Sequence, residues 1–140
     1  MNNEQYKNKL VAVLNKSIEH GKVMNALAHM CIGLGAVIGK EELRLTDYKD
    51  ADGNSHPHIS ELPFIILSEN SNKIRKLRNE AVTNNIIFND FTDTMTIGTY
   101  KEQIERTLQV KDENLVYYGI VLFGDWDKVT ELTKKYSLWR

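Results

Sequence analysis

A glycine–lysine pair, Gly21-Lys22, is followed by His29 seven residues after the lysine, and these residue types could bind or activate a substrate. In a helix, side chains seven residues apart return to nearly the same azimuth, so Lys22, His29 and the intervening Asn25 would share one face. A lysine in the first turn is electrostatically unfavourable, because that end of a helix carries partial positive charge. Lys22 therefore either helps the helix end to bind an anion such as phosphate or points into water. His29 either packs between this helix and a sheet or takes part in the chemistry.

A second candidate group contains Asp90 and Thr94, which follow the apolar run 86–88. Carboxylates and hydroxyls at the end of a central strand can accept protons and orient a water molecule. A lysine nearby would keep Asp90 ionised, and a cluster of lysine, aspartate and threonine suits hydrolysis through a polarised carbonyl. The alternative is a loop that turns and caps a helix, because Asp and Thr are favoured in such loops.

Two further patterns match metal sites only in part. The spacing from Asp50 to Glu61 resembles a calcium-binding loop, but Ser55 stands where that loop needs a glycine. His56 and His58 would lie on the same face of a strand, without an evident third ligand for a metal ion. The sequence also has no glycine-rich phosphate-binding loop of a standard pattern. We therefore predict no metal site and no cofactor.

The charged residues argue against one class of function and leave another open. The chain has 18 Lys and Arg against 19 Asp and Glu, a net charge of −1, which argues against a strongly basic nucleic-acid binder. The run 73–78 carries four positive charges, and it either contacts a nucleic-acid backbone such as tRNA or is the solvated face of a helix. Residues 1–40 contain five basic and two acidic residues, whereas residues 41–62 contain two basic and six acidic ones. The balanced total therefore still allows one anion-binding face that includes Gly21-Lys22.

The elements that position these residues alternate between strands and helices. Short apolar runs without clean polar alternation predict strands buried on both faces, and recurrence at helical spacing predicts helices. In order, we expect a strand at 9–15, a helix at 21–39, a hairpin at 43–60, a strand at 64–67, a helix from 70 or 71 to 84, a strand at 86–88, a helix at 100–108, a strand at 115–123 and a last helix from 125 or 127 to 136. This order predicts an α/β fold with a mixed, mostly parallel sheet, helices on both faces, and the hairpin as the antiparallel exception. Ligands of such sheets bind beyond the carboxyl ends of the strands, where the loop 15–21 would lie.

Length and composition fit one domain that spans residues 1–140. A chain of 140 residues with 41% hydrophobic and 26% charged residues can bury a core and leaves little room for a second domain. The single cysteine, Cys31, excludes an internal disulfide and is expected to be a buried thiol. The polar start carries no export signal, and no run approaches the ~18 apolar residues of a membrane span. We therefore predict a cytoplasmic protein with no membrane partner.

Several motifs together resemble known families. The apolar run 10–14, Gly21-Lys22 and Asn25-Ala-Leu-Ala-His29 resemble the first strand and helix of type II peptidyl-tRNA hydrolases. The whole chain more closely resembles an uncharacterised family, a domain of unknown function with that same fold. The motifs that carry this second resemblance are Gly21-Lys-Val-Met-Asn-Ala-Leu-Ala-His29, Asp50-Ala-Asp-Gly53 with His56 and Ile59-Ser60, Pro63-Phe-Ile-Ile-Leu67, Gly119-Ile-Val-Leu-Phe-Gly124, and Leu132-Thr133 to Leu138-Trp-Arg140.

These resemblances imply a compact mixed sheet flanked by helices, and a homodimer. Lys22 would match the lysine at the catalytic centre of the hydrolases. Asp90 and Thr94 would match their aspartate and the threonine four residues later. The chain departs from the hydrolases at Thr92, where they have a glycine, and at Ala26, where they have a glutamine.

Two functions follow from these observations. The first is a binding module that holds a small anionic or acyl ligand at the helix end marked by Lys22. Its ligand-binding residues would be Gly21, Lys22, Asn25 and His29. The alternative is a hydrolase of the peptidyl-tRNA type, with Lys22, Asp90 and Thr94 as catalytic residues and the run 73–78 as a contact for the tRNA. The departures from the hydrolase pattern favour the binding module.

Overall fold

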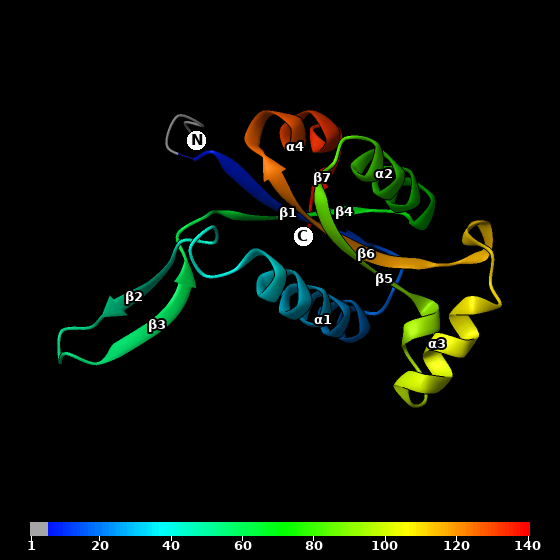
Figure 1. Ribbon diagram of the computed structural model, residues 1–140, viewed down its shortest axis with the longest axis horizontal. Helices are drawn as coiled ribbons and strands as arrows, with labels where there is room; N and C mark the ends of the chain where they lie inside the picture. Colours follow the sequence, from blue (N-terminus) through cyan, green and yellow to red (C-terminus); the bar gives the residue numbers. More distant parts are fainter. Residues whose placement is uncertain (1–5) are drawn as a thin grey trace.

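A mixed sheet of five strands forms the centre of the structure, a computed structural model that describes residues 6–140 (Figure 1). The strands lie side by side in the order β5-β6-β1-β4-β7. Their bounds are Asn8–Asn15 for β1, Phe64–Glu69 for β4, Ile87–Thr92 for β5, Tyr117–Asp125 for β6 and Ser137–Leu138 for β7. The central strand β1 pairs with β4 on one side and β6 on the other, and it is buried from Leu10 to its end.

The expectation of a mostly parallel sheet is wrong. Only β1 and β4 pair in parallel within this sheet of the described residues, whereas β1–β6, β5–β6 and β4–β7 are antiparallel. Apolar runs without polar alternation indicate burial on both faces, and helices on both faces bury antiparallel strands equally well. Strand direction depends on the connections instead: β5 and β6 are neighbours joined at one end of the sheet, so β6 returns antiparallel. The prediction of a mixed α/β fold is confirmed.

Helices cover both faces of this sheet, as predicted (Figure 1). Helix α1, His20–Ile38, lies on one face, and helices α2, Ser71–Thr83, and α4, Trp126–Thr133, lie on the other. Helix α3, Tyr100–Leu108, lies beyond the end of β5 and beside the start of α1. Two 3₁₀ segments, Asp93–Met95 and Asp112–Asn114, complete the connection from β5 to β6.

Capping side chains fix where three of these helices begin. Asn70 accepts the backbone N–H of Lys73 at 2.9 Å and caps α2. Asp125 accepts that of Lys128 at 3.1 Å and caps α4. A reciprocal capping box of Thr99 and Glu102 starts α3. The predicted helix starts at 70 or 71 and at 125 or 127 fit these caps, because Asn and Asp side chains are favoured acceptors at helix starts.

Alternation along β1 divides the core into two layers. Leu10 and Leu14 pack in the layer beneath α1, and Val11 and Val13 pack in the layer beneath α2 and α4. Helix α1 approaches the sheet closely at Gly33, where a Cβ atom would lie 2.9 Å from a side chain of β5. The close packing concerns Gly33 alone, because a Cβ atom on Gly35 would make only an ordinary contact of 3.8 Å with Leu43.

The predicted hairpin is confirmed, and it stands apart from the main sheet. Its strands, β2 (Leu45–Lys49) and β3 (Ser55–Ser60), form a separate two-stranded antiparallel sheet, which we call the arm. The Asp50 side chain shapes the turn by accepting the N–H groups of Asp52 and Asn54, each at 2.9 Å. The arm projects from the body of the molecule beyond the C-terminal end of α1 (Figure 1).

Two further boundaries differ from the predictions. Strand β5 runs to Thr92, so Asp90 lies inside a strand and not in the loop after it. The short strand β7 was not predicted, because two residues carry no periodic pattern. Beside β7, Trp139 donates its backbone N–H to Ile66 O at 2.9 Å, which brings its ring to 5.4 Å from that of His20 at the start of α1.

Helix α1 is the one helix of residues 6–140 that is long and apolar enough to cross a membrane. The expectation that no segment approaches this length and composition is therefore wrong. The helix buries Val23, Ala26, Met30 and Leu34 against the sheet. A single helix of this kind is weak evidence for a membrane protein, because a core helix has the same composition.

Candidate functional site

The candidate site is built at the loop between β1 and α1. The buried side chain of Asn15 ends β1 by donating to Tyr117 O at 2.8 Å and accepting the N–H of Ser17 at 2.8 Å. Lys16 donates its N–H to Glu69 O at 3.1 Å, which ties the same loop to β4. These bonds hold the loop to both neighbouring strands, so the start of α1 is fixed at the carboxyl end of β1. The sequence predicted the loop at this edge of the sheet.

The first turn of α1 is electropositive and has no side-chain cap. Glu19 occupies the N-cap position without a side-chain hydrogen bond to the helix, and no acidic residue lies in the first turn. The Nζ of Lys22 lies 3.7 Å from a carboxylate oxygen of Glu19, and both side chains are largely exposed. An exposed pair of this kind contributes little free energy, so an anionic ligand could replace Glu19 as the partner of Lys22.

A cavity of about 320 Å³ opens beside this helix end. It is lined by Gly21, Lys22, Asn25, Phe91, Thr96, Ile97 and Tyr118. The lining therefore offers one ammonium group, one amide, one hydroxyl and two aromatic rings, and no carboxylate belongs to it. A Cβ atom placed on Gly21 would meet nothing within 4 Å, so the packing of the protein itself does not require a glycine there.

Aromatic rings form the apolar side of this cavity. The ring centroids of Phe91 and Tyr118 lie 5.9 Å apart, and the ring of His29 stacks on Phe91 with a centroid distance of 6.0 Å. His29 is exposed and does not line the cavity itself. Its ring contacts Phe91, which lines the cavity, so His29 packs against a lining residue from outside the cavity.

Three of the four predicted ligand-binding residues thus surround one cavity. The structure brings Gly21, Lys22 and Asn25 together, and it places His29 against a lining residue. Sequence reasoning missed Phe91, Thr96, Ile97 and Tyr118. Strand alternation was the available signal: once Asp90 is placed on a strand, its neighbour Phe91 must face the opposite side of the sheet.

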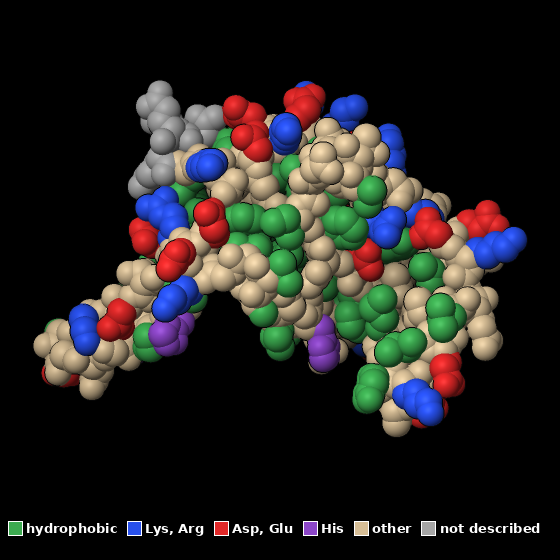
Figure 2. Space-filling model, viewed as in Figure 1, with side chains coloured by type: hydrophobic (Ala, Val, Ile, Leu, Met, Phe, Trp, Pro, Cys, Tyr) green, Lys and Arg blue, Asp and Glu red, His purple; other side chains and the backbone are tan. Residues whose placement is uncertain are grey.

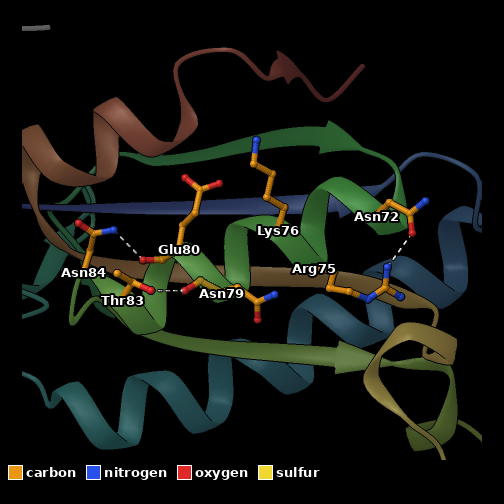
Figure 3. A pocket seen from close by; sticks show the side chains of 7 residues that line it. All are labelled: Asn72, Arg75, Lys76, Asn79, Glu80, Thr83 and Asn84. Atoms are coloured by element: carbon orange, nitrogen blue, oxygen red, sulfur yellow. Dashed lines mark hydrogen bonds between the residues drawn. The ribbon is translucent and has the colours of Figure 1, made fainter.

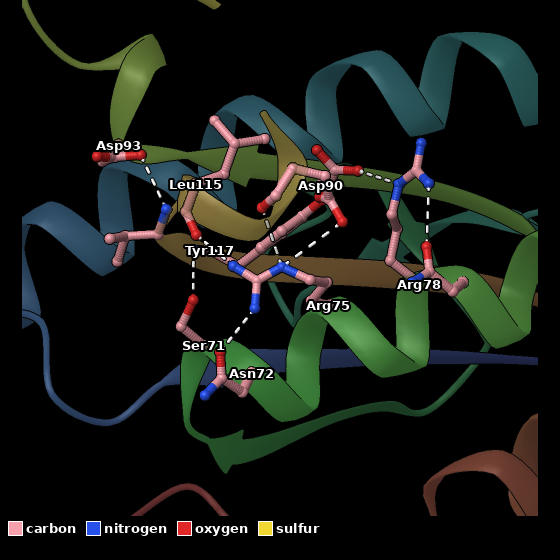
Figure 4. Close-up of polar contacts among 11 residues, drawn as sticks. Ser71, Asn72, Arg75, Arg78, Asp90, Asp93, Leu115 and Tyr117 are labelled. Atoms are coloured by element: carbon pink, nitrogen blue, oxygen red, sulfur yellow. Dashed lines mark hydrogen bonds and ion pairs between the residues drawn. The ribbon is translucent and has the colours of Figure 1, made fainter. Parts of the chain in front are cut away.

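Asp90 lies on that other side and is not near Lys22. Its neighbours along β5, Asn89 and Phe91, face α1, whereas Asp90 faces α2 and lies 3.4 Å from Nε of Arg78 (Figure 4). Burial raises the pKa of the Asp90 carboxyl above its usual value of 3.8, and the Arg78 guanidinium opposes that rise. The sheet therefore separates Asp90 from the lysine with which it was predicted to act.

Asp90 belongs to a polar layer beneath α2 that is satisfied within the chain (Figure 4). Tyr117 donates its hydroxyl to Asp112 at 2.5 Å, and the Arg75 guanidinium lies over the Tyr117 ring at 5.3 Å. Arg75 also donates to Asp112 O at 3.1 Å. Burial, followed by the hydrogen bond to Asp112, raises the pKa of Tyr117 well above its usual value. Within residues 6–140 no buried side-chain nitrogen or oxygen lacks a hydrogen-bond partner.

Thr94 is buried and fastens α3 to the end of β5. Its hydroxyl lies 2.7 Å from that of Thr92 and 2.8 Å from that of Thr107, and its carbonyl accepts a bond from Arg106 at 3.0 Å. Thr94 therefore lies outside the cavity lining, although Thr96 two residues later belongs to it. The three predicted catalytic residues thus occupy three separate environments.

The basic run 73–78 forms part of the outer face of α2. Ile74 and Leu77 are fully buried, as one of the two interpretations predicted, and Lys73 lies 3.5 Å from Glu69. A shallow cavity of about 400 Å³ follows this face (Figure 3), lined by Asn72, Arg75, Lys76, Asn79, Glu80, Thr83 and Asn84. Because Arg75 and Arg78 are held by carboxylates of the same chain, this face offers few uncompensated charges to a polyanion.

The remaining candidates form local contacts. His56 Nε2 lies 2.9 Å from Asp50 in the turn of the arm. In the described part of the chain, no three His, Cys, Asp or Glu side chains are placed to hold a metal ion. Cys31 is half-buried, and burial raises the pKa of its thiol, which makes it a poor nucleophile.

Comparisons with known proteins identify a family and a fold. A family described as a protein of unknown function, DUF2000, matches residues 8–140. A solved structure of a protein of unknown function from Agrobacterium tumefaciens superposes with a TM-score of 0.82. It is 18% identical in sequence, and the match covers 96% of this chain and 99% of the other. No curated protein matches the sequence. At this identity the solved structure shows the fold alone.

Proposed function

The chain belongs to the DUF2000 family, whose function is unknown, and from this premise we propose that it binds a small anionic ligand at the N-terminal end of α1. The observation that carries the proposal is the cavity of about 320 Å³ that brings Lys22 and Asn25 together with the rings of Phe91 and Tyr118. Its polar and apolar sides suit a ligand that joins a carboxylate or phosphate to an acyl or aromatic group. This volume is at the lower end of the range of small-molecule sites.

The charge distribution supports the choice of an anion. The first turn of α1 presents backbone N–H groups and the positive end of the helix dipole, and no carboxylate of the chain caps it. Lys22 adds a full positive charge at the same end and lies in the cavity lining. A ligand carboxylate or phosphate could therefore accept hydrogen bonds from the uncapped backbone N–H groups and pair with the Lys22 ammonium. Within the chain, the N–H groups have no side-chain cap and Lys22 has only the exposed Glu19 as a partner.

We also propose that the fold is of the type II peptidyl-tRNA hydrolase kind. Three features support this proposal: a buried first strand, the pair Gly21-Lys22 at the start of the following helix, and His29 on the same helix. The hydrolase activity itself has less support. Lys22 and Asp90 lie on opposite faces of the sheet, and Thr94 is buried in a hydroxyl cluster. Binding without hydrolysis is therefore the function that the geometry favours.

A thermal-shift experiment tests the binding site. Phenyl phosphate combines the phosphate and the ring that the cavity suits, inorganic phosphate lacks the ring, and benzyl alcohol lacks the charge. We expect phenyl phosphate to raise the Tm of the wild-type protein most, because of the three compounds it alone carries both the phosphate and the ring. A ligand at 100 times its Kd stabilises the folded protein by about 2.7 kcal/mol. Lys22→Ala should lose this rise. Gly21→Ala should fold normally, since its added Cβ has open space, and should weaken binding if the ligand approaches the helix end.

A matched lysine provides the control. Lys76 is exposed on α2, on the other face of the sheet, so Lys76→Ala should keep the full rise in Tm. Equal shifts for the wild-type protein and Lys22→Ala, or no shift with any of the three compounds, would contradict the proposal. Cleavage of a model peptidyl-tRNA that both Lys22→Ala and Asp90→Asn abolish would instead support the hydrolase.

A further inference from the structure

Helix α3 exposes its apolar residues to the outside. None of its nine residues is buried. Tyr100, Ile104 and Leu108 follow one another at intervals of four residues, so they form a stripe along one side of the helix. All three are more than half exposed, as is Ile97 just before the helix. A surface helix normally turns its apolar stripe toward the core, so the stripe of α3 is available to another molecule.

A cavity of about 420 Å³ follows this stripe, and we call it the α3 groove. It is lined by Met95, Tyr100, Gln103, Ile104, Thr107 and Leu108, and none of the four charged residues of α3 belongs to the lining. Figure 2 shows hydrophobic side chains gathered over α3. The polar members of the lining already bond within the chain: the Gln103 amide donates to Gly98 O at 3.2 Å, and the Thr107 hydroxyl donates to Gln103 O at 2.7 Å. The α3 groove therefore suits an apolar group.

Hydrogen bonds to the end of β5 hold the α3 groove in shape. The hydroxyl of the buried Thr94 lies 2.8 Å from that of Thr107, and Arg106 donates to Thr94 O at 3.0 Å. The capping box of Thr99 and Glu102 fixes the start of the helix. A site that is formed before its ligand arrives loses less conformational freedom on binding, which favours affinity.

The segment 95–97 lies between the α3 groove and the cavity at the start of α1. Met95 lines the groove, whereas Thr96 and Ile97 line the cavity. Met95 also packs against the core layer that contains Phe91, a further residue of the cavity lining. Helix α3 lies beside the start of α1 (Figure 1). A ligand bound at Lys22 can therefore reach the α3 groove by crossing three residues.

The two linings together have one charge, and it lies at one end. Among the seven residues that line the cavity and the six that line the α3 groove, only Lys22 is charged. The complement of this surface is a molecule with one anionic group at one end and an apolar remainder. Helix α3 has nine residues and is about 13–14 Å long, so the groove can take an extended chain of several methylenes.

We propose that the ligand is a single-chain amphiphile, whose carboxylate or phosphate head binds at Lys22 and whose alkyl or acyl chain crosses the segment 95–97 into the α3 groove. This inference rests on the proposed function, which places the head. It adds the class of the ligand and a second half of the site.

The size of the apolar stripe favours one chain over a protein partner. The four exposed side chains on and before α3 present on the order of 400 Å² of surface. This is about half of the ~800 Å² that each partner contributes to a standard protein interface. A single alkyl chain needs less surface than a folded partner, and it fits a groove that runs along one helix.

Isothermal titration calorimetry with ethyl, butyl, hexyl and octyl phosphate, each below its micelle concentration, tests the proposal. Because each methylene that is about half buried tightens binding by about twofold, the Kd should fall on the order of 50-fold from ethyl to octyl phosphate. The alkanoates of the same lengths test a carboxylate head, and the same trend in either series supports the proposal. Octyltrimethylammonium has the same chain with the opposite charge and should bind more weakly than octyl phosphate.

Substitutions in the α3 groove separate the chain from the head. Ile104→Ser should reduce the gain from the longer chains and leave the Kd of ethyl phosphate unchanged. Ile104 is 57% exposed, so the variant should keep the circular dichroism spectrum of the wild type, and Leu108→Ser, at an 82% exposed position, is a second variant of this kind. Val82→Ser is the matched control, because Val82 is 52% exposed on α2. Lys22→Ala should weaken the binding of every phosphate in the series.

The possible results distinguish this inference from the proposed function. Equal Kd values for all chain lengths, still weakened by Lys22→Ala, would keep the anion site and overturn the amphiphile. No binding of any compound would overturn both. A dependence on chain length that survives both Ile104→Ser and Leu108→Ser would place the chain outside the α3 groove and overturn the inference. Co-sedimentation with phosphatidylglycerol vesicles without binding of octyl phosphate would assign the stripe to a membrane surface instead.

Discussion

The two faces of the five-stranded sheet are covered by helices of different character. Beneath α2 the charged side chains pair with each other, as Arg78 does with Asp90 and Arg75 with Asp112. On the other face, α1 has no charged residue after Lys22, and the lining of its cavity contains a single cation, Lys22 itself. The residue types most often found in active sites thus lie where the chain satisfies them itself. Of the two long helices, α1 has fewer charged residues, and it is the one beside the cavity that has groups to offer to another molecule.

The largest expected effect separates these faces by a matched pair of substitutions. Ile74 on α2 is fully buried, and Ile32 on α1 is 72% exposed. We expect Ile74→Ala to lower the free energy of unfolding by about 2–5 kcal/mol, because it leaves a cavity in the core. Ile32→Ala should change it by less than about 0.5 kcal/mol, as for other surface substitutions. Urea unfolding at sub-micromolar protein, where association contributes little, measures both. Similar losses for the two variants would mean that α1 is covered on both sides within the monomer.

The second effect concerns the charge that the α2 face holds. Burial raises the pKa of Asp90, with Arg78 opposing the rise. An acid whose pKa is raised on folding stabilises the folded state fully below its unfolded value near 3.8, and this contribution is lost as the pH rises through the folded-state pKa. Asp90→Asn cannot ionise and avoids this loss. Its free energy of unfolding relative to the wild type should therefore rise between pH 3.8 and neutrality.

Urea unfolding at a series of pH values provides this comparison. Arg78→Gln is the companion variant: it removes the charge that favours the ionised carboxyl, so the stability of this variant should fall more steeply with pH than that of the wild type. A relative stability of Asp90→Asn that falls with pH would show instead that the ion pair outweighs burial. In that case the ionised Asp90 carboxylate, paired with Arg78, would contribute net stability to the folded protein.

The sequence predicted most elements of the fold because each has a local signal. Asn70 and Asp125 marked helix starts, and the apolar run of β1 marked a buried strand. Strand direction had no such signal, since burial on both faces looks the same for parallel and antiparallel neighbours. The two residues of β7 were too few to form a pattern. Strand direction and the pairing of β7 depend on how distant parts of the chain come together. A short stretch of sequence contains no information about this.

The candidate site was predicted where its residues share one helix. Gly21, Lys22 and Asn25 are held together by helical spacing, and the cavity confirms that they lie on a common surface. Asp90 was misplaced relative to Lys22 because strand alternation depends on where the strand ends, and β5 is longer than predicted. Phe91, the next residue, faces the cavity for the same reason. A one-residue difference along a strand thus decides which face carries a side chain.

The third effect tests how closely α1 packs on its sheet. Gly33 and Gly35 lie two residues apart in the helix, but only Gly33 is crowded: a Cβ atom there would lie 2.9 Å from Nδ2 of Asn89, against 3.8 Å to the nearest atom at Gly35. Gly35→Ala should stabilise the protein by about 0.5–1 kcal/mol through helix propensity. Gly33→Ala should lose that gain, because Asn89 must move and give up its 3.0 Å bond to Met30 O. Thermal unfolding measures the difference as a few degrees in Tm. Equal gains would mean that the inner side of α1 is as open as its outer side.

The smallest effect lies in the turn of the arm, where Asp50 is held by hydrogen bonds within the chain. The bond from His56, with those from backbone N–H groups of the turn, lowers the pKa of Asp50 to about 2. A lowered pKa means that Asp50 stabilises the turn above its ordinary value of 3.8 and that this contribution is lost as the pH falls toward 2. A carboxyl ¹³C titration should give a midpoint near 2 in the wild type, and His56→Ala should raise it because the largest cause of the shift is removed. His58→Asn is the control, since Asn tolerates the positive φ of 65° at that position and His58 makes no bond to Asp50 among those of the turn. If the midpoint stays near 2 in His56→Ala, the backbone N–H groups of the turn are sufficient to keep the Asp50 carboxyl ionised.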